Sequence, residues 1–93
     1  MLSGMSQPES VMTLMQSEDI QIMIERGLPG AEVQVSGDGR HFDAVVVTDA
    51  FAGKSLLEQH RMVYATLGEK MGGDIHALTM RTFTRAQWEQ TKV

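Results

Sequence analysis

Two alternating stretches separated by a glycine-rich turn most strongly restrict what this chain can fold into. Residues 31–36 alternate apolar and polar side chains, residues 41–48 form a β-branched run, and Ser-Gly-Asp-Gly at 36–39 is typical of a turn. Alternation with period two is the pattern of strands with one buried face, so the sequence predicts a β-hairpin. The side chains expected on its buried face are Ala31, Val33, Val35, Phe42, Ala44 and Val46.

Two helices are predicted on either side of this hairpin. The first has Ser17 as its N-cap and stops at Gly27, which we expect to be left-handed. The second begins at a capping box formed by Ser55 and Glu58 and runs to about Met71. At 3.6 residues per turn, its apolar residues and one histidine share a sector that we expect to be buried. These residues are Leu56, Leu57, His60, Val63, Tyr64, Leu67 and Met71.

The C-terminal part of the chain predicts a third strand and a last helix. Residues 75–83 read as the strand, with His76, Leu78 and Met80 on one face. Residues 84–87 form a second capping box, which opens a short helix containing Trp88. The order helix, hairpin, helix, strand, helix is best satisfied by one small sheet with helices on one face.

The length of 93 residues is enough for one domain. We interpret residues 1–16, rich in Met, Ser and Gln, as a flexible leader, and residues 17–93 as the folded domain. No run approaches the roughly 20 apolar residues of a membrane span, so no membrane partner is expected. The leader lacks the basic and apolar segments of a secretory signal, which makes the cytoplasm the expected compartment.

Charge and cysteine content narrow the chemistry. A net charge of −4 argues against a polyanion as the main partner. With no cysteine, the chain alone cannot supply a disulfide, a thiolate nucleophile or a Cys-based metal site. Besides the methionines, imidazole is the remaining softer metal ligand. His41 and His76 are expected at strand ends, whereas His60 fits a hydrogen-bonded core histidine. Periodicity alone leaves open whether His41 and His76 converge.

No catalytic arrangement is visible in the sequence. Gly53, Lys54 and Ser55 look like the end of a phosphate-binding P-loop, but Thr48 stands where that motif needs its first glycine. Lys54 is better interpreted as a surface residue and Ser55 as a helix cap. No nucleophile stands in a recognisable pattern with a base. We therefore expect that the protein is not an enzyme.

Residues 51–64 resemble the central signature of BolA-like proteins. Residues 75–84, followed by Trp88, are similar to their C-terminal signature, and the likeness covers about residues 20–88. The turn segment 36–42 is similar to that of the bacterial members linked to acid stress. The resemblance implies an α/β (α+β) sandwich of the class II KH-like type, with a three-stranded mixed sheet, helices on one face and the order αββααβα.

The resemblance also implies a function. BolA-like proteins pair with monothiol glutaredoxins in a heterodimer that shares a bridged [2Fe–2S] cluster with glutathione, in cluster assembly, trafficking, or redox and stress regulation. The family's ligand histidine corresponds to His76 and its second ligand to His41, whereas His60, Gly53 and Ser55 are assigned structural roles. Imidazole in place of thiolate resembles the Rieske arrangement, and this would explain how a chain without cysteine takes part in such a site. Alone, the chain would be a monomer or weak homodimer.

Two alternatives stay open. The KH-like fold and some family members suggest a DNA-binding transcriptional regulator, for which Arg81, Arg85 and Lys92 give a weak basic bias against Glu89. Such contact would amount to weak DNA binding in an acidic protein. The other alternative is an interaction module that binds the partner without a cluster through the same face.

Overall fold

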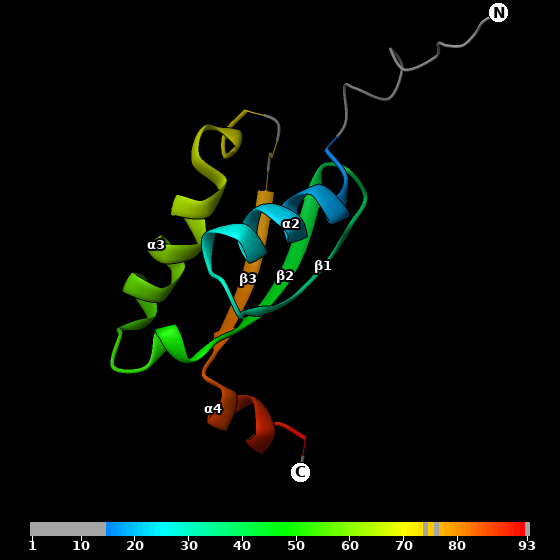
Figure 1. Ribbon diagram of the computed structural model, residues 1–93. Helices are drawn as coiled ribbons and strands as arrows, with labels where there is room; N and C mark the ends of the chain where they lie inside the picture. The colour runs from blue at the N-terminus through cyan, green and yellow to red at the C-terminus, as the bar shows by residue number, and fades with distance from the viewer. Residues whose placement is uncertain (1–14, 74, 76, 93) are drawn as a thin grey trace, which may run out of the picture.

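The computed structural model describes residues 15–73, 75 and 77–92. Figure 1 shows α2 and α3 on one side of the sheet and α4 beyond one of its ends. The predicted order of elements and the three-stranded sheet with helices are confirmed. The elements are α2 (Ser17–Gly27), β1 (Glu32–Gly37), β2 (His41–Val47), η2 (Asp49–Phe51), α3 (Leu56–Leu67), η3 (Gly68–Lys70), β3 (Ala77–Phe83) and α4 (Arg85–Gln90).

The sheet is mixed, with the strand order β1-β2-β3. β1 and β2 form the predicted antiparallel hairpin, in which Val33 lies beside Val46. β2 and β3 are parallel, and Phe42 lies beside Leu78. A parallel pair needs a crossover between its strands, and α3 supplies it. The central strand β2 is thus the strand against which both others are fixed.

The hydrophobic core lies between the sheet and the pair α2 and α3. The hairpin contributes the face predicted from its alternation, and Phe51 of η2 is fully buried. Each large apolar side chain buried here contributes roughly 1.5–3 kcal/mol of stability. The core residues are Ile20, Ile24, Val33, Phe42, Ala44, Val46, Phe51, Val63, Leu67, Ile75 and Met80.

Both ends of α2 differ from the prediction. The N-cap is Gln16 rather than Ser17, and the backbone N–H of Gln16 donates to Oδ2 of Asp19 at 3.1 Å. Gly27 does not have a positive φ; the left-handed glycine after this helix is Gly30, at φ 87°. Gly27 instead lies against Thr66 of α3, so close that a Cβ would clash. Its missing side chain lets the two helices approach.

α3 is shorter than predicted, and β3 starts later. The helix ends at Leu67 rather than near Met71, because Gly68 turns the chain at φ 55°. Ile75 is buried and forms only an isolated bridge with Met71, so β3 begins at Ala77 and not at residue 75. In the part of the chain that the structure describes, no helix is long and apolar enough to cross a membrane.

The buried face of α3 is rotated from the predicted apolar sector. Leu56, Leu57 and Tyr64 are 63, 59 and 40% exposed, although all three were expected in the core. The residues actually buried are Gln59, Val63 and Leu67. The physical reason is that α3 packs against α2 and β3 and nothing among the described residues covers its other flank. The hydrophobic pattern therefore marks a wider arc than the neighbouring elements bury.

Candidate functional site

His41 lies exposed at the first position of β2, where the hairpin turn meets the sheet. Its backbone is held by Asp38, whose Oδ1 accepts from the amide N–H groups of Arg40 at 2.9 Å and His41 at 3.0 Å. The amide of Asp38 in turn donates to the carbonyl of His41 at 3.3 Å. The turn therefore fixes the main chain of His41 and leaves its imidazole facing solvent.

The Asp38 carboxylate is stabilised in its charged form. The amide N–H groups of His41 and, secondly, Arg40 hold the pKa of Asp38 below its usual value, because hydrogen bonds to a carboxylate favour ionisation. Asp38 is therefore ionised at neutral pH and accepts both hydrogen bonds. The sequence signalled a turn at Asp-Gly but did not identify Asp38 as the residue that organises it.

β3 begins directly beside His41. Ala77 is the register partner of His41, and its amide N–H donates to the carbonyl of Arg40 at 3.2 Å. His76 precedes Ala77 in sequence but lies outside the described residues, so the convergence of the two imidazoles stays a prediction. A shallow hollow of about 200 Å³ adjoins the site. It is lined by Ser36, Gly37, His41, Phe42, Asp43 and Thr79.

The three residues assigned structural roles lie away from this hollow. Ser55 is the N-cap of α3, as predicted: its Oγ accepts from the amide of Glu58 at 3.1 Å, and Glu58 Oε1 accepts from the Ser55 amide at 2.8 Å. Gly53 has φ 76°, a backbone conformation that favours glycine. His60 is half-buried on α3 and is not one of the core residues, so the expected core histidine lies at the margin.

Gln59 of α3 has a structural role that the sequence did not predict. Its Nε2 donates to the carbonyls of Phe51 at 3.3 Å and Lys54 at 3.1 Å. Its Oε1 accepts from the hydroxyl of Thr82 at 2.6 Å. One buried amide thus joins the segment before α3 to β3. A glutamine within a helix carries no sequence signal of such a role.

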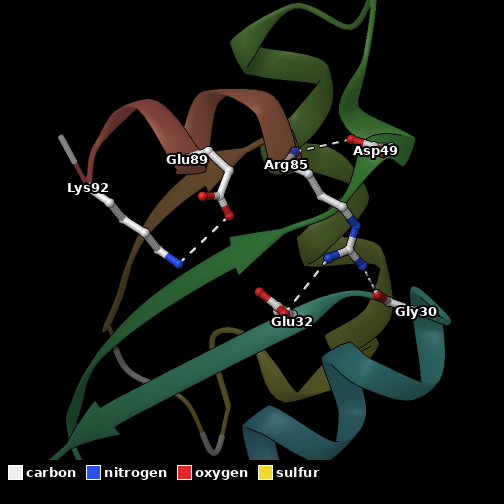
Figure 2. A network of polar contacts seen from close by, with 6 residues as sticks. All are labelled: Gly30, Glu32, Asp49, Arg85, Glu89 and Lys92. Carbon is white, nitrogen blue, oxygen red and sulfur yellow. Dashed lines mark hydrogen bonds and ion pairs between the residues drawn. The ribbon is translucent and has the colours of Figure 1, made fainter.

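The C-terminal cations are engaged with acidic groups (Figure 2). The amide of Arg85 donates to Oδ1 of Asp49 at 3.1 Å, and its guanidinium donates to the carbonyl of Gly30 at 2.7 Å and lies 3.8 Å from Glu32. Lys92 lies 3.8 Å from the carboxylate of Glu89. Two of the three cations behind the predicted basic bias are therefore paired, which lowers the positive charge offered to a polyanion.

His41 alone cannot hold a metal ion. Within residues 15–73, 75 and 77–92, no group of three or more His, Asp or Glu side chains could hold one. A metal centre at this end of the sheet would need further ligands, either from His76 or from a second molecule. The described residues can therefore supply part of the ligand set of a metal centre but not a complete set.

Comparison with known proteins gives the same fold and a family. The model of the BolA-like protein family matches residues 13–87. The chain is 43% identical over 54 residues to the DNA-binding transcriptional regulator BolA of Escherichia coli, which is 58% of this chain and 51%, about half, of that relative. It is 34% identical over 79 residues to the acid stress protein IbaG of Escherichia coli, 84% of this chain and 94% of IbaG.

A solved structure agrees with both sequence matches. A bolA protein homologue from Coxiella burnetii is similar with a TM-score of 0.75 and 43% identity, over 82% of this chain and 99% of the homologue. The sequence signatures, the mixed sheet with its helices and these matches agree over most of the domain. The chain belongs to the family of BolA-like proteins.

Proposed function

We propose that this protein is a non-catalytic partner of a monothiol glutaredoxin that contributes histidine ligation to a bridged [2Fe–2S] cluster. The observation that carries the proposal is the exposed imidazole of His41, on a main chain fixed by Asp38 and beside the first residue of β3. A chain without cysteine cannot supply thiolate to such a site, whereas imidazole can take the place of some of the thiolates.

The donor set fits a shared cluster. A [2Fe–2S] cluster takes about four protein ligands, and imidazole replaces thiolate at one iron in Rieske centres, which raises the reduction potential. His41 and His76 would supply the imidazole side, and the glutaredoxin with its glutathione the thiolate side. This chain would supply at most these two histidines, so its residues alone would not complete the ligand set of the cluster.

The chain's own residues prepare one side of this site. The imidazole of His41 forms no hydrogen bond among the described residues, so none of these residues competes for its ring nitrogens through a hydrogen bond. The bond from Ala77 to Arg40 fixes the start of β3 against the turn. Fixing the backbone before binding lowers the ordering cost of bringing the ligands together. The adjoining hollow offers a surface on which a partner can rest.

The test is anaerobic reconstitution of the full chain with a monothiol glutaredoxin, iron, sulfide and glutathione. We expect a heterodimer whose visible absorption and circular dichroism differ from those of the glutaredoxin homodimer. His76→Ala and His41→Ala should each shift the spectrum or the cluster stability. His60→Ala is the matched control, because it removes the remaining histidine from α3 and should leave the spectrum unchanged.

The outcomes separate the parts of the proposal. An unchanged spectrum for both His76→Ala and His41→Ala would remove the ligand assignment. A heterodimer that forms without iron and never takes up a cluster would favour the interaction module. Absence of any complex with the glutaredoxin would remove the partnership itself.

A second candidate function is DNA binding, favoured by the name of the Escherichia coli relative. Against it, Arg85 and Lys92 are paired with acidic side chains in a chain of net charge −4. Contacts to phosphates lose affinity steeply with salt. Binding to one duplex sequence that persists at physiological salt would support regulation of transcription. Binding that disappears there without sequence preference would reduce it to non-specific contact.

A further inference from the structure

β3 is an edge strand with an unpaired side. Its first amide, from Ala77, donates to Arg40, and its last carbonyl, from Phe83, accepts from the amide of Thr48 at 2.9 Å. In a parallel ladder the residues bonded to one neighbour alternate along the strand. Leu78, Met80 and Thr82 therefore direct their N–H and C=O groups away from β2, where no described strand lies. Such an edge can accept another strand.

An apolar surface lies on the same side of the molecule. We call the exposed residues Leu56, Leu57 and Tyr64 the α3 stripe. At about 100° per residue, Tyr64 lies roughly opposite Thr66, which faces α2 through Gly27. Leu57, nine residues before Thr66, also lies on the side opposite to it, so these two residues of the stripe point away from α2, and Figure 1 shows α3 at the β3 side of the sheet, away from β1. The unpaired edge and the α3 stripe are neighbours.

The open face of the sheet carries a complementary pair of charges. Asp43 and Arg81 are exposed there, and neither forms an ion pair within the described part of the chain. Asp43 lies beside Thr79 in the register of β2 and β3. If a second β3 pairs antiparallel about Met80, its Arg81 falls beside Thr79. Strands are about 4.8 Å apart, so that guanidinium can reach over the short threonine to Asp43.

We infer that this protein forms a two-fold symmetric homodimer through antiparallel pairing of β3 with β3 of a second copy. The pairing satisfies the outward backbone groups of Leu78, Met80 and Thr82 and extends the sheet. Arg81 of each copy meets Asp43 of the other, and the two α3 stripes cover one another. A symmetric interface of this kind uses one patch twice. The dimer does not use the imidazole of His41, and its test is separate from the test of cluster ligation.

The test is sedimentation equilibrium of the full chain over a range of concentrations, with charge exchange. Arg81→Asp and Asp43→Arg should each raise the dimer dissociation constant about tenfold or more, because each places like charges opposite one another. An equimolar mixture of the two single variants should form a heterodimer, since every pair across it is then of opposite charge. The double variant should self-associate like the natural chain.

Two further measurements address the strand edge and the stripe. Leu57→Ser should weaken the dimer, whereas Ile22→Ser should not, because Ile22 is an exposed apolar residue of α2, 45% accessible and outside the interface. Hydrogen exchange of the Leu78, Met80 and Thr82 amides should slow as the concentration rises.

Several results would overturn the homodimer. A chain that stays monomeric throughout the concentration range would do so, as would single variants that fail to form a heterodimer when mixed. Protection of the three β3 amides only after addition of a glutaredoxin would assign this edge to that protein instead. Each readout is self-association or exchange, so failure here leaves the proposed cluster ligation separately testable.

Discussion

The hairpin and α3 respond to the same hydrophobic signal in different ways. In the hairpin, Val33, Phe42 and Val46 are all buried, as their alternation predicts. In α3, Leu57 and Tyr64 belong to the apolar sector and yet are exposed, while polar Gln59 is buried. A strand has two faces and the core takes one. A helix offers a continuous arc, and only its neighbours decide which part of that arc is covered.

The strongest test of this difference compares Phe42→Ala with Leu57→Ala. Phe42 is 3% exposed in the core, so its truncation should lower the free energy of unfolding by about 3–5 kcal/mol. Leu57 is 59% exposed, so the same kind of truncation should change the stability of the monomer by less than about 0.5 kcal/mol. Urea denaturation at low protein concentration measures both. A loss at Leu57 that approaches the loss at Phe42 would contradict the rotated face of α3.

The next effect in size concerns the buried amide of α3. Gln59→Leu keeps the approximate volume but removes the donor to Phe51 and Lys54 and the acceptor for Thr82. Leaving such groups unsatisfied should cost about 1–3 kcal/mol. Thr82→Val supplies the control in a double-mutant cycle, again read from urea denaturation. If Gln59 and Thr82 are hydrogen-bonded, the double variant loses less free energy of unfolding than the sum of the losses in the two single variants.

The sequence predicts the fold well and the site only in part, for reasons visible in particular residues. The capping box of Ser55 and Glu58 and the hairpin alternation depend on residues near each other in the chain, and both predictions are confirmed. The role of Gly27 depends on its contact with Thr66, far along the sequence. No local pattern contains that contact, so a left-handed cap was the natural but wrong expectation.

The same distinction applies to the candidate site. His41 is exposed at the strand end where the pattern placed it, because a turn and a strand are local features. The start of β3 at Ala77 depends on where α3 ends and on the bridge between Met71 and Ile75. The sequence predicts that this strand begins at residue 75. The prediction that His76 shares a face with the later strand residues depends on that start. Convergence of His76 with His41 is a long-range property and stays a prediction.

A smaller effect is expected where α3 begins. Ser55→Ala removes the hydroxyl that accepts from the amide of Glu58 and should cost about 1 kcal/mol. Thr84→Ala at the start of α4 is the matched comparison, because Thr84 caps its helix in the same way. α4 is six residues long and contributes none of the core residues. The loss for Thr84 in thermal denaturation should therefore be the smaller; equal losses would show that core packing does not set the value of a cap.

The smallest effect is a pH dependence that compares the turn at His41 with the start of α3. Amide hydrogen bonds hold the pKa values of both Asp38 and Glu58 below their usual range, from His41 at Asp38 and from Ser55 at Glu58. A carboxylate with a lowered pKa in the folded state adds stability above its ordinary pKa, and this contribution is lost as the pH falls through the folded-state value. The difference in urea midpoint between the natural chain and Asp38→Asn should therefore be constant near neutrality and shrink below about pH 4. Glu58→Gln should behave likewise in the same acid range. Two further variants remove the acceptors themselves: Asp38→Ala should change the cluster spectrum of the reconstituted complex, because it removes the oxygen that fixes the backbone of His41, whereas Glu58→Ala should not. If both variants changed the spectrum equally, the turn would have no special part in presenting the imidazole.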